Sequence, residues 1–292
     1  MIRLNSSFIA LSLLLAACSG TPDIEVPEDI AAMENVEVYP KEMEPAGNLI
    51  FKDSLVIDDN SGILFSGRIS AMENEQGEIF VTDYTQRKIF QFDEEGEFIR
   101  EYGGEGNGPG EFTGIQYPDV RNGILAAYDW GPRRLNLYDT DTGELIRDFV
   151  VVYEEEGEEG EWLINGFRIM EDGNLLARMT RAVRPQSADP EMDNRLMRIS
   201  PDGTFLDDNL LQLEEPPAVN IGGVFTARPQ FMAQLIVRMN GNGFFYGITD
   251  RLMIISRDHS GSNESAFYYD LAGEQVTQAD IEESGQGLPP QF

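Results

Sequence analysis

Four stretches of the chain repeat one alternation of apolar runs and polar turns. They begin at Gly67, Gly114, Gly166 and Leu235. In each stretch, short runs rich in Ile, Val, Phe and Tyr are separated by polar segments, which is typical of β-strands joined by turns. Each stretch therefore predicts four strands, in the order strand, turn, strand, loop, strand, turn, strand. No amphipathic segment of helical period competes with this interpretation.

The turns of the four stretches are chemically alike. The first turn ends in a glycine, at Gly77, Gly123, Gly173 and Gly243. The second turn carries Asp and Gly, starting at Asp93, Asp139, Asp202 and Asp258. Glycine supplies a positive φ in such turns, and Asp accepts hydrogen bonds from the local backbone. The spacing of the repeats fits four-stranded propeller blades of about 40–45 residues, except in the third interval, which holds two insertions.

One segment carries a family resemblance. The sequence GEIFVTDYTQRKIFQFDEEGEFIREYGGEGNGPGEF, residues 77–112, resembles a blade of the NHL-like six-bladed β-propellers. More narrowly, the chain resembles the six-bladed propeller lipoproteins of Bacteroidetes-type bacteria. The first stretch matches strongly, the second well, and the other two only in their strand and turn pattern. The resemblance extends over residues 67–271 and implies an all-β fold of four-stranded antiparallel blades.

The number of repeats predicts an incomplete ring. Only four stretches have the full strand pattern, and the segment after the fourth has no strand pairs. Residues 47–67 have strand character and could add a partial fifth blade. We therefore expect a propeller domain over residues 48–292, truncated at its C-terminal end or completed by a partner. The apolar faces at the two open ends would favour association.

Residues 103–112, GGEGNGPGEF, are the densest glycine stretch. The spacing fits neither a dinucleotide fingerprint nor a P-loop, and no helix is predicted after it. We expect this stretch to connect two blades, with Phe112 as its anchor between them. We also expect Gly106 and Gly108 to adopt backbone angles that other residues avoid.

The N-terminus resembles a lipoprotein signal. Arg3 precedes a short apolar run that ends in Leu-Ala-Ala-Cys, which is too short to span a membrane. Residues 1–17 are expected to be a signal peptide, and Cys18 the lipid-attachment site that anchors the protein to the membrane. Ser19 after this cysteine suggests the outer membrane. Residues 18–47, rich in Pro, Glu and Asp, are expected to be an acidic flexible tether.

The charge is extreme. The formal net charge is -31, from 52 acidic and 21 basic residues. Such a surface argues against nucleic acid and anionic lipid as partners. The basic residues are nearly all arginine. This composition resembles that of proteins from salty environments, where screening relieves the mutual repulsion of carboxylates. Cation binding by the acidic surface is the alternative.

Charged residues near the end of the second strand are the candidate ligand-binding groups. These are Asp83, Asp129 and Asp250, followed closely by Arg87, Arg133 and Arg251. Such residues could form a ring of charges at one mouth of the channel and hold a polar ligand. The alternative is that the aspartates cap turns while the arginines lie on the surface.

Two classes of function remain after these observations. The first is a non-enzymatic module that binds a ligand, an envelope protein or a saccharide, the last through aromatics such as Trp130 and Phe244–Tyr246. The second is a metal-dependent propeller enzyme of the lactonase or NHL-lyase type. His259 is the only histidine, which excludes a metal site with two histidine ligands. No catalytic residue and no resident cofactor is predicted. Whether the protein has a metal site stays unknown, and calcium is the metal to test. The binding module is the favoured interpretation.

Overall fold

The structure of the protein is a computed structural model. It describes residues 26–40, 47–50, 55–57, 62–154, 161–183, 191–206, 210–213, 219–221, 225–227, 233–260, 264–269, 277 and 279–280. Cys18 and the predicted signal peptide lie outside these residues. Within them, no helix is long and apolar enough to cross a membrane. The first helix is a single turn, α1 (Glu28–Ala31).

Four sheets that each contain four consecutive antiparallel strands form the fold, which confirms the predicted blades and the all-β class. Blade 1 consists of β2 (Ile69–Glu73), β3 (Ile79–Asp83), β4 (Lys88–Phe92) and β5 (Phe98–Gly103). Blade 2 consists of β6 (Ile115–Arg121), β7 (Ile124–Asp129), β8 (Arg134–Asp139) and β9 (Leu145–Val150). Blade 3 consists of β10 (Leu163–Ile169), β11 (Leu175–Val183), β12 (Glu191–Ile199) and β13 (Leu211–Leu213). Blade 4 consists of β16 (Leu235–Asn240), β17 (Gly243–Ile248), β18 (Met253–Asp258) and β19 (Glu264–Tyr269).

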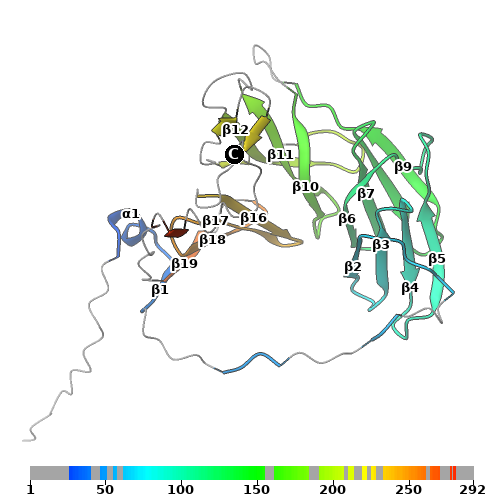
Figure 1. Cartoon of the computed structure of the whole chain (residues 1–292), viewed down its shortest axis with the longest axis horizontal. Helices are drawn as coiled ribbons and strands as arrows, with labels where there is room; N and C mark the ends of the chain where they lie inside the picture. Colours follow the sequence, from blue (N-terminus) through cyan, green and yellow to red (C-terminus); the bar gives the residue numbers. More distant parts are fainter. Residues whose placement is uncertain are drawn as a thin grey trace, which may run out of the picture.

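The blades pack face to face through apolar side chains. Neighbouring innermost strands contact one another in the order β2, β6, β10 and β16. Phe80 of blade 1 packs with Leu125 of blade 2, and Phe167 of blade 3 packs with Leu135 of blade 2. Phe244 of blade 4 is buried against blade 3. Figure 1 shows the result, an arc of blades with blades 1 and 4 at its ends.

The turns have the predicted chemistry. Gly77, Gly123 and Gly173 have positive φ values of 83°, 73° and 82°. Gly243 differs: it begins β17, and a side chain there would collide with the Arg257 backbone. In the second turns, all four aspartates accept backbone N–H groups from the residues that follow them. Among these, Asp139 caps a hairpin turn.

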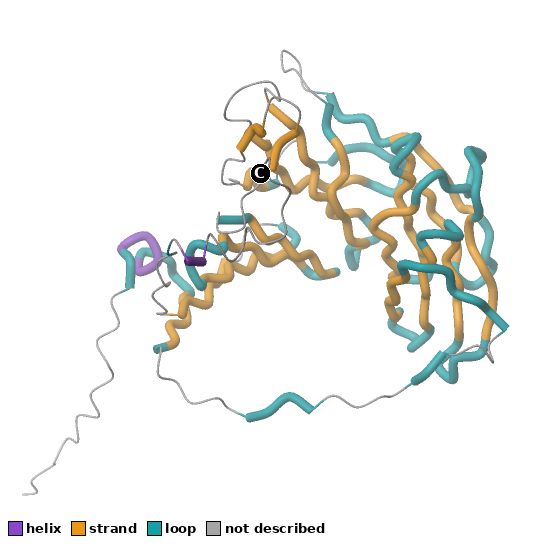
Figure 2. Tube along the Cα trace, viewed as in Figure 1, coloured by secondary structure: helices purple, strands orange, loops and turns teal. Residues whose placement is uncertain are grey.

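The predicted tether of residues 18–47 is wrong at Val36–Tyr39. Val36–Tyr39 forms strand β1, which pairs in parallel with β19 and becomes the fifth strand of blade 4. The alternation Val-Glu-Val-Tyr suits a strand, and the free edge of β19 offers the backbone partners. Figure 2 shows this strand at the edge of the sheet opposite β16.

The possible partial fifth blade is also absent from the described part of residues 47–67, where no strand forms. Ile57, Ile63 and Phe65 instead pack as irregular chain on Val81, Phe90 and Phe92 of blade 1. These three apolar residues therefore cover the outer face of blade 1. The extra strands lie in the third interval, as the hairpin of β14 (Val219–Ile221) and β15 (Phe225–Ala227).

Candidate functional site

A polar pocket lies where the innermost strands of all four blades end. Its volume is about 340 Å³. Its lining residues are Glu73, Asn74, Glu75, Asp119, Val120, Arg121, Arg168, Ile169, Met239, Asn240 and Gly241. Each innermost strand runs from a connector to the first turn of its blade, so the four strand ends converge at one end of the arc. We call this the axial pocket.

Asp119 is the most buried charge of the axial pocket. Its carboxylate accepts a 2.6 Å hydrogen bond from the Ile169 amide and lies 3.6 Å from the Arg168 guanidinium. Burial raises the pKa of Asp119 to about 6, although Arg168 and the Ile169 amide both act to lower it. Asp119 therefore links blade 2 to blade 3 and changes its charge near neutral pH.

Arg121 links three blades around the same pocket. It extends from β6 toward Glu75 of blade 1, and its Nε lies 3.5 Å from the Glu75 carboxylate. On the other side it lies against Gly241 of blade 4, where the methyl group of an alanine would overlap the guanidinium. The absence of a side chain at Gly241 therefore leaves room for this arginine.

The backbone of β6 and β10 is irregular beside the pocket. The strand register shifts between Gln116 and Asp119 in blade 2, and between Ile164 and Phe167 in blade 3. Bulges of this kind redirect side chains at functional sites. The arrangement presents carboxylates and guanidinium groups together, and it can therefore bind a small polar molecule that carries charges of both signs.

The predicted site residues Asp83 and Asp129 lie elsewhere, at the opposite ends of the innermost strands. Asp83 is fully buried and accepts hydrogen bonds from the Ser66, Thr85 and Gln86 amides. Burial acts to raise the pKa of Asp83, but these backbone hydrogen bonds outweigh it and hold the pKa below its usual value. The carboxylate thus fixes the chain that enters blade 1.

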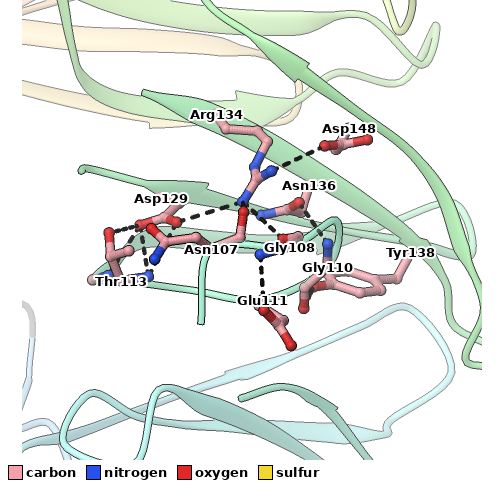
Figure 3. A network of polar contacts seen from close by, with 11 residues as sticks. Asn107, Gly108, Gly110, Glu111, Thr113, Asp129, Arg134, Asn136, Tyr138 and Asp148 are labelled. Atoms are coloured by element: carbon pink, nitrogen blue, oxygen red, sulfur yellow. Dashed lines mark hydrogen bonds and ion pairs between the residues drawn. The ribbon is translucent and has the colours of Figure 1, made fainter. Parts of the chain in front are cut away.

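Asp129 does the same in blade 2. It is fully buried and accepts the Thr113 and Gly114 amides and the Thr113 hydroxyl at 2.7–3.1 Å. Arg134 lies 4.0 Å away (Figure 3). The geometry therefore gives both aspartates the capping role that was the alternative at the sequence level. Their binding of a ligand stays a prediction.

Arg87 and Arg133 occupy equivalent positions four residues after these aspartates. Both have left-handed backbone angles, with φ of 58° and 57°. Each forms an ion pair with a glutamate of the connector that follows its blade, Arg87 with Glu105 and Arg133 with Glu161, at 2.5 Å. These arginines hold the connectors in place on the surface.

Asp250 and Arg251 do not match the other two pairs. Strand β17 ends at Ile248, so Asp250 lies in the following turn, where it is half exposed. The Thr249 hydroxyl instead accepts the amide of Gln234, the residue that precedes β16. Thr249 therefore takes over the capping role in blade 4, and the predicted equivalence of Asp250 with Asp83 and Asp129 is wrong.

The glycine-rich stretch is a connector between blades 1 and 2, as predicted. Phe112 is fully buried between the two blades. Arg134 donates to the Asn107 and Gly108 carbonyls, and the Tyr138 hydroxyl donates to the Gly110 carbonyl (Figure 3).

The expectation about glycine geometry in this connector is wrong in detail. Positive φ occurs at Gly103, Gly104 and Gly110, whereas Gly106 and Gly108 have ordinary values. At Gly106 and Gly108 an added side chain would instead meet the Glu111 carboxylate.

The sequence did not predict the axial pocket, because the charged residues that recur in the repeats stand at the end of the second strand. A signal was present at the end of the first strand, where AMENE, PDVRN and FRIMED place charges just before the turn glycine. Among the described residues, no group of three or more His, Cys, Asp or Glu side chains is arranged so that it could hold a metal ion.

Comparisons with known proteins agree with the fold. Residues 61–162, which cover blades 1 and 2 and the connector to blade 3, match a family described as 6-bladed beta-propeller. No curated protein matches the sequence.

Solved structures resemble the chain only distantly. One is a Bacteroides fragilis protein whose name proposes that it is exported. It is 12% identical, with 80% of each chain covered and a TM-score of 0.42. Virginiamycin B lyase from Staphylococcus aureus is 14% identical, with a TM-score of 0.35 over 68% of this chain and 54% of the lyase. BamB from Moraxella catarrhalis is 12% identical, with a TM-score of 0.34 over 71% of this chain and 66% of BamB. Such scores carry no argument about function. The chain is thus a β-propeller of four-stranded blades whose first two blades match a six-bladed family.

Proposed function

We propose that the protein is a cell-envelope lipoprotein whose propeller is a non-enzymatic binding module. The observation that supports this function best is the axial pocket, to which every blade contributes side chains. Its volume of about 340 Å³ suits a small molecule, and its walls carry three carboxylates and two guanidinium groups. A small zwitterion, such as an amino acid or a short peptide, complements both signs of charge.

Two groups on the pocket wall are placed to hold opposite ends of such a ligand. The Arg168 side chain is 41% exposed, and its guanidinium group can bind the carboxylate of a ligand in addition to that of Asp119. Glu75 is 45% exposed and can bind an ammonium group. The ligand would thus span the width of the pocket, from blade 3 to blade 1.

Calorimetric titration with amino acids, dipeptides, simple amines and simple carboxylates tests this proposal. We expect saturable binding of zwitterions that Arg168→Gln weakens at least tenfold, because a charge-assisted pair contributes about 1.5–3 kcal/mol. Arg147→Gln, on the exposed strand β9, is the matched control and should bind normally. The proposal fails if no zwitterion binds, or if both variants weaken binding equally.

Cys18 carries the envelope part of the proposal. The motif Leu-Ala-Ala-Cys supports cleavage before Cys18 and acylation on it, and the chain is expected at the outer membrane. Cys18→Ser should release the protein from the membrane fraction. Retention of the variant in membranes after a high-salt wash would contradict the lipid anchor.

The alternative, a metal-dependent enzyme of the lactonase or NHL-lyase type, has no supporting observation in the described residues. Calcium belongs in the same titration. Tight calcium binding that requires pocket carboxylates would favour this alternative.

A further inference from the structure

The outer face of blade 4 is an exposed apolar surface. Its residues are Ile236, Phe245, Leu252, Ile254, Phe267 and Tyr269, which surround a hollow of about 360 Å³. Tyr39 of β1 extends the same face by stacking on Tyr269 at 4.9 Å. Exposed apolar patches of this extent on a soluble surface mark interaction sites.

The strand register shows what kind of surface this is. Three exposed residues of blade 4 correspond to residues that blade 2 packs against blade 3. The pairs are Phe245 with Ala126, Ile254 with Leu135, and Phe267 with Phe149. Ala126 and Leu135 are fully buried in that contact, whereas Ile254 is 53% exposed. The outer face of blade 4 is therefore a blade-packing face that no blade covers among the residues that the structure describes.

We propose that this face binds the same face of a second copy, so that two chains pair blade 4 to blade 4. The opposite end of the arc cannot serve, because Ile57, Ile63 and Phe65 already cover the outer face of blade 1. A head-to-tail contact between copies is thereby blocked. The blade 4 face remains, and pairing it with itself gives a closed dimer rather than a filament.

The face is self-complementary, as a twofold contact requires. Its centre is apolar, and its rim carries both signs in Asp250 and Arg251. In a twofold arrangement, each of these residues can meet the opposite charge on the second copy. Inside the propeller the equivalent face of blade 2 meets the opposite face of blade 3, whereas in the dimer two like apolar sheet faces would meet.

The size of the face sets the strength of the contact. Five strands spaced about 4.8 Å apart and about 20 Å long give roughly 500 Å² of buried surface per copy, or about 1,000 Å² in total. This value is at the lower limit of specific interfaces, so the pair should be weak and dependent on concentration. The net charge of -31 on each copy opposes it, and salt should therefore strengthen it.

Cross-linking of the full-length chain in non-ionic detergent tests the proposal. Ile254→Cys places a thiol on the face, and Ile146→Cys places one on β9 at nearly the same exposure, 53% against 54%. A short bismaleimide should give a covalent dimer with the first variant and not with the second. The native chain, whose only cysteine is Cys18, reports any cross-linking through that residue.

Two further measurements make the result decisive. Phe245→Glu added to Ile254→Cys should reduce the cross-linked fraction at least fivefold, with an unchanged circular dichroism spectrum. Raising sodium chloride from about 0.1 to 1 M should increase dimer formation, because it screens the repulsion between copies. Equal cross-linking of the two cysteine variants, cross-linking that survives Phe245→Glu, ladders beyond the dimer, or loss of the dimer in salt would each overturn the proposal.

Discussion

Replacing Asp129 by Ala should destabilise the protein strongly, although this residue is far from the axial pocket. The substitution removes the acceptor for two backbone amides and one hydroxyl, all from Thr113 and Gly114. Leaving such donors without a charged acceptor costs about 1–2 kcal/mol each. The sum is about 3–6 kcal/mol, a large part of the 5–15 kcal/mol that is typical of a folded protein.

Urea unfolding, followed by circular dichroism and tryptophan fluorescence, measures this loss. With a slope of about 3 kcal/mol per molar urea, the midpoint should fall by about 1–2 M. Asp250→Ala is the matched control, because Asp250 is 52% exposed in a turn and should change the free energy of unfolding by less than about 0.5 kcal/mol. Equal losses in the two variants, or a loss below about 1 kcal/mol for Asp129→Ala, would refute the capping argument.

Three other outcomes follow from the structure. The pKa of Asp119 is about 6 in the folded state against a usual 3.8, so the native state holds an extra proton between these two pH values. This residue therefore lowers the free energy of unfolding as the pH rises from about 4 to 6. In Asp119→Asn this loss, about 2 kcal/mol between pH 4.5 and 7, should disappear from the free energies of unfolding that urea titrations give at these two pH values. An unchanged pH dependence would contradict the raised pKa of Asp119. Gly103→Ala should lower stability by more than Gly104→Ala, because both have positive φ but only the former would press on the Phe112 ring; a calorimetric comparison that ranks them the other way would contradict the packing. Finally, the melting temperature should rise up to about 1 M sodium chloride as carboxylate repulsion is screened, and a flat curve would exclude repulsion as a major term.

Much of the fold was predictable because the propeller repeats its local rules. Short apolar runs mark the strands, the turn residue Asp93 has an equivalent in every blade, and the turn glycine Gly77 has equivalents in blades 2 and 3. The connector was also predictable, since Phe112 stands as a single apolar residue among glycines and charges. These features depend on residues close together in the chain.

The missed features depend on contacts between distant residues. Nothing within the sequence Val36–Tyr39 says that it will pair with Tyr269 more than 200 residues later. Likewise, burial at the contact between blades 2 and 3 raises the pKa of Asp119, and its partners Arg168 and Ile169 lie about 50 residues further along the chain. Thr249 replaces aspartate as a cap in blade 4. It stands one residue after Ile248, which is equivalent to Asp129, and its hydroxyl accepts the amide of the residue before β16, a change that a pattern of residue types does not detect.

The parallel pairing of β1 with β19 has a mechanical consequence. Tension on the N-terminus, such as a membrane anchor at Cys18 would transmit, pulls β1 along its own axis while β19 belongs to the body of blade 4. All backbone hydrogen bonds between the two strands are then loaded in shear and must break together, instead of opening one by one as in a peeled hairpin. The strand that completes the edge of blade 4 would thus also be the point that resists force when the protein is pulled from its N-terminal side.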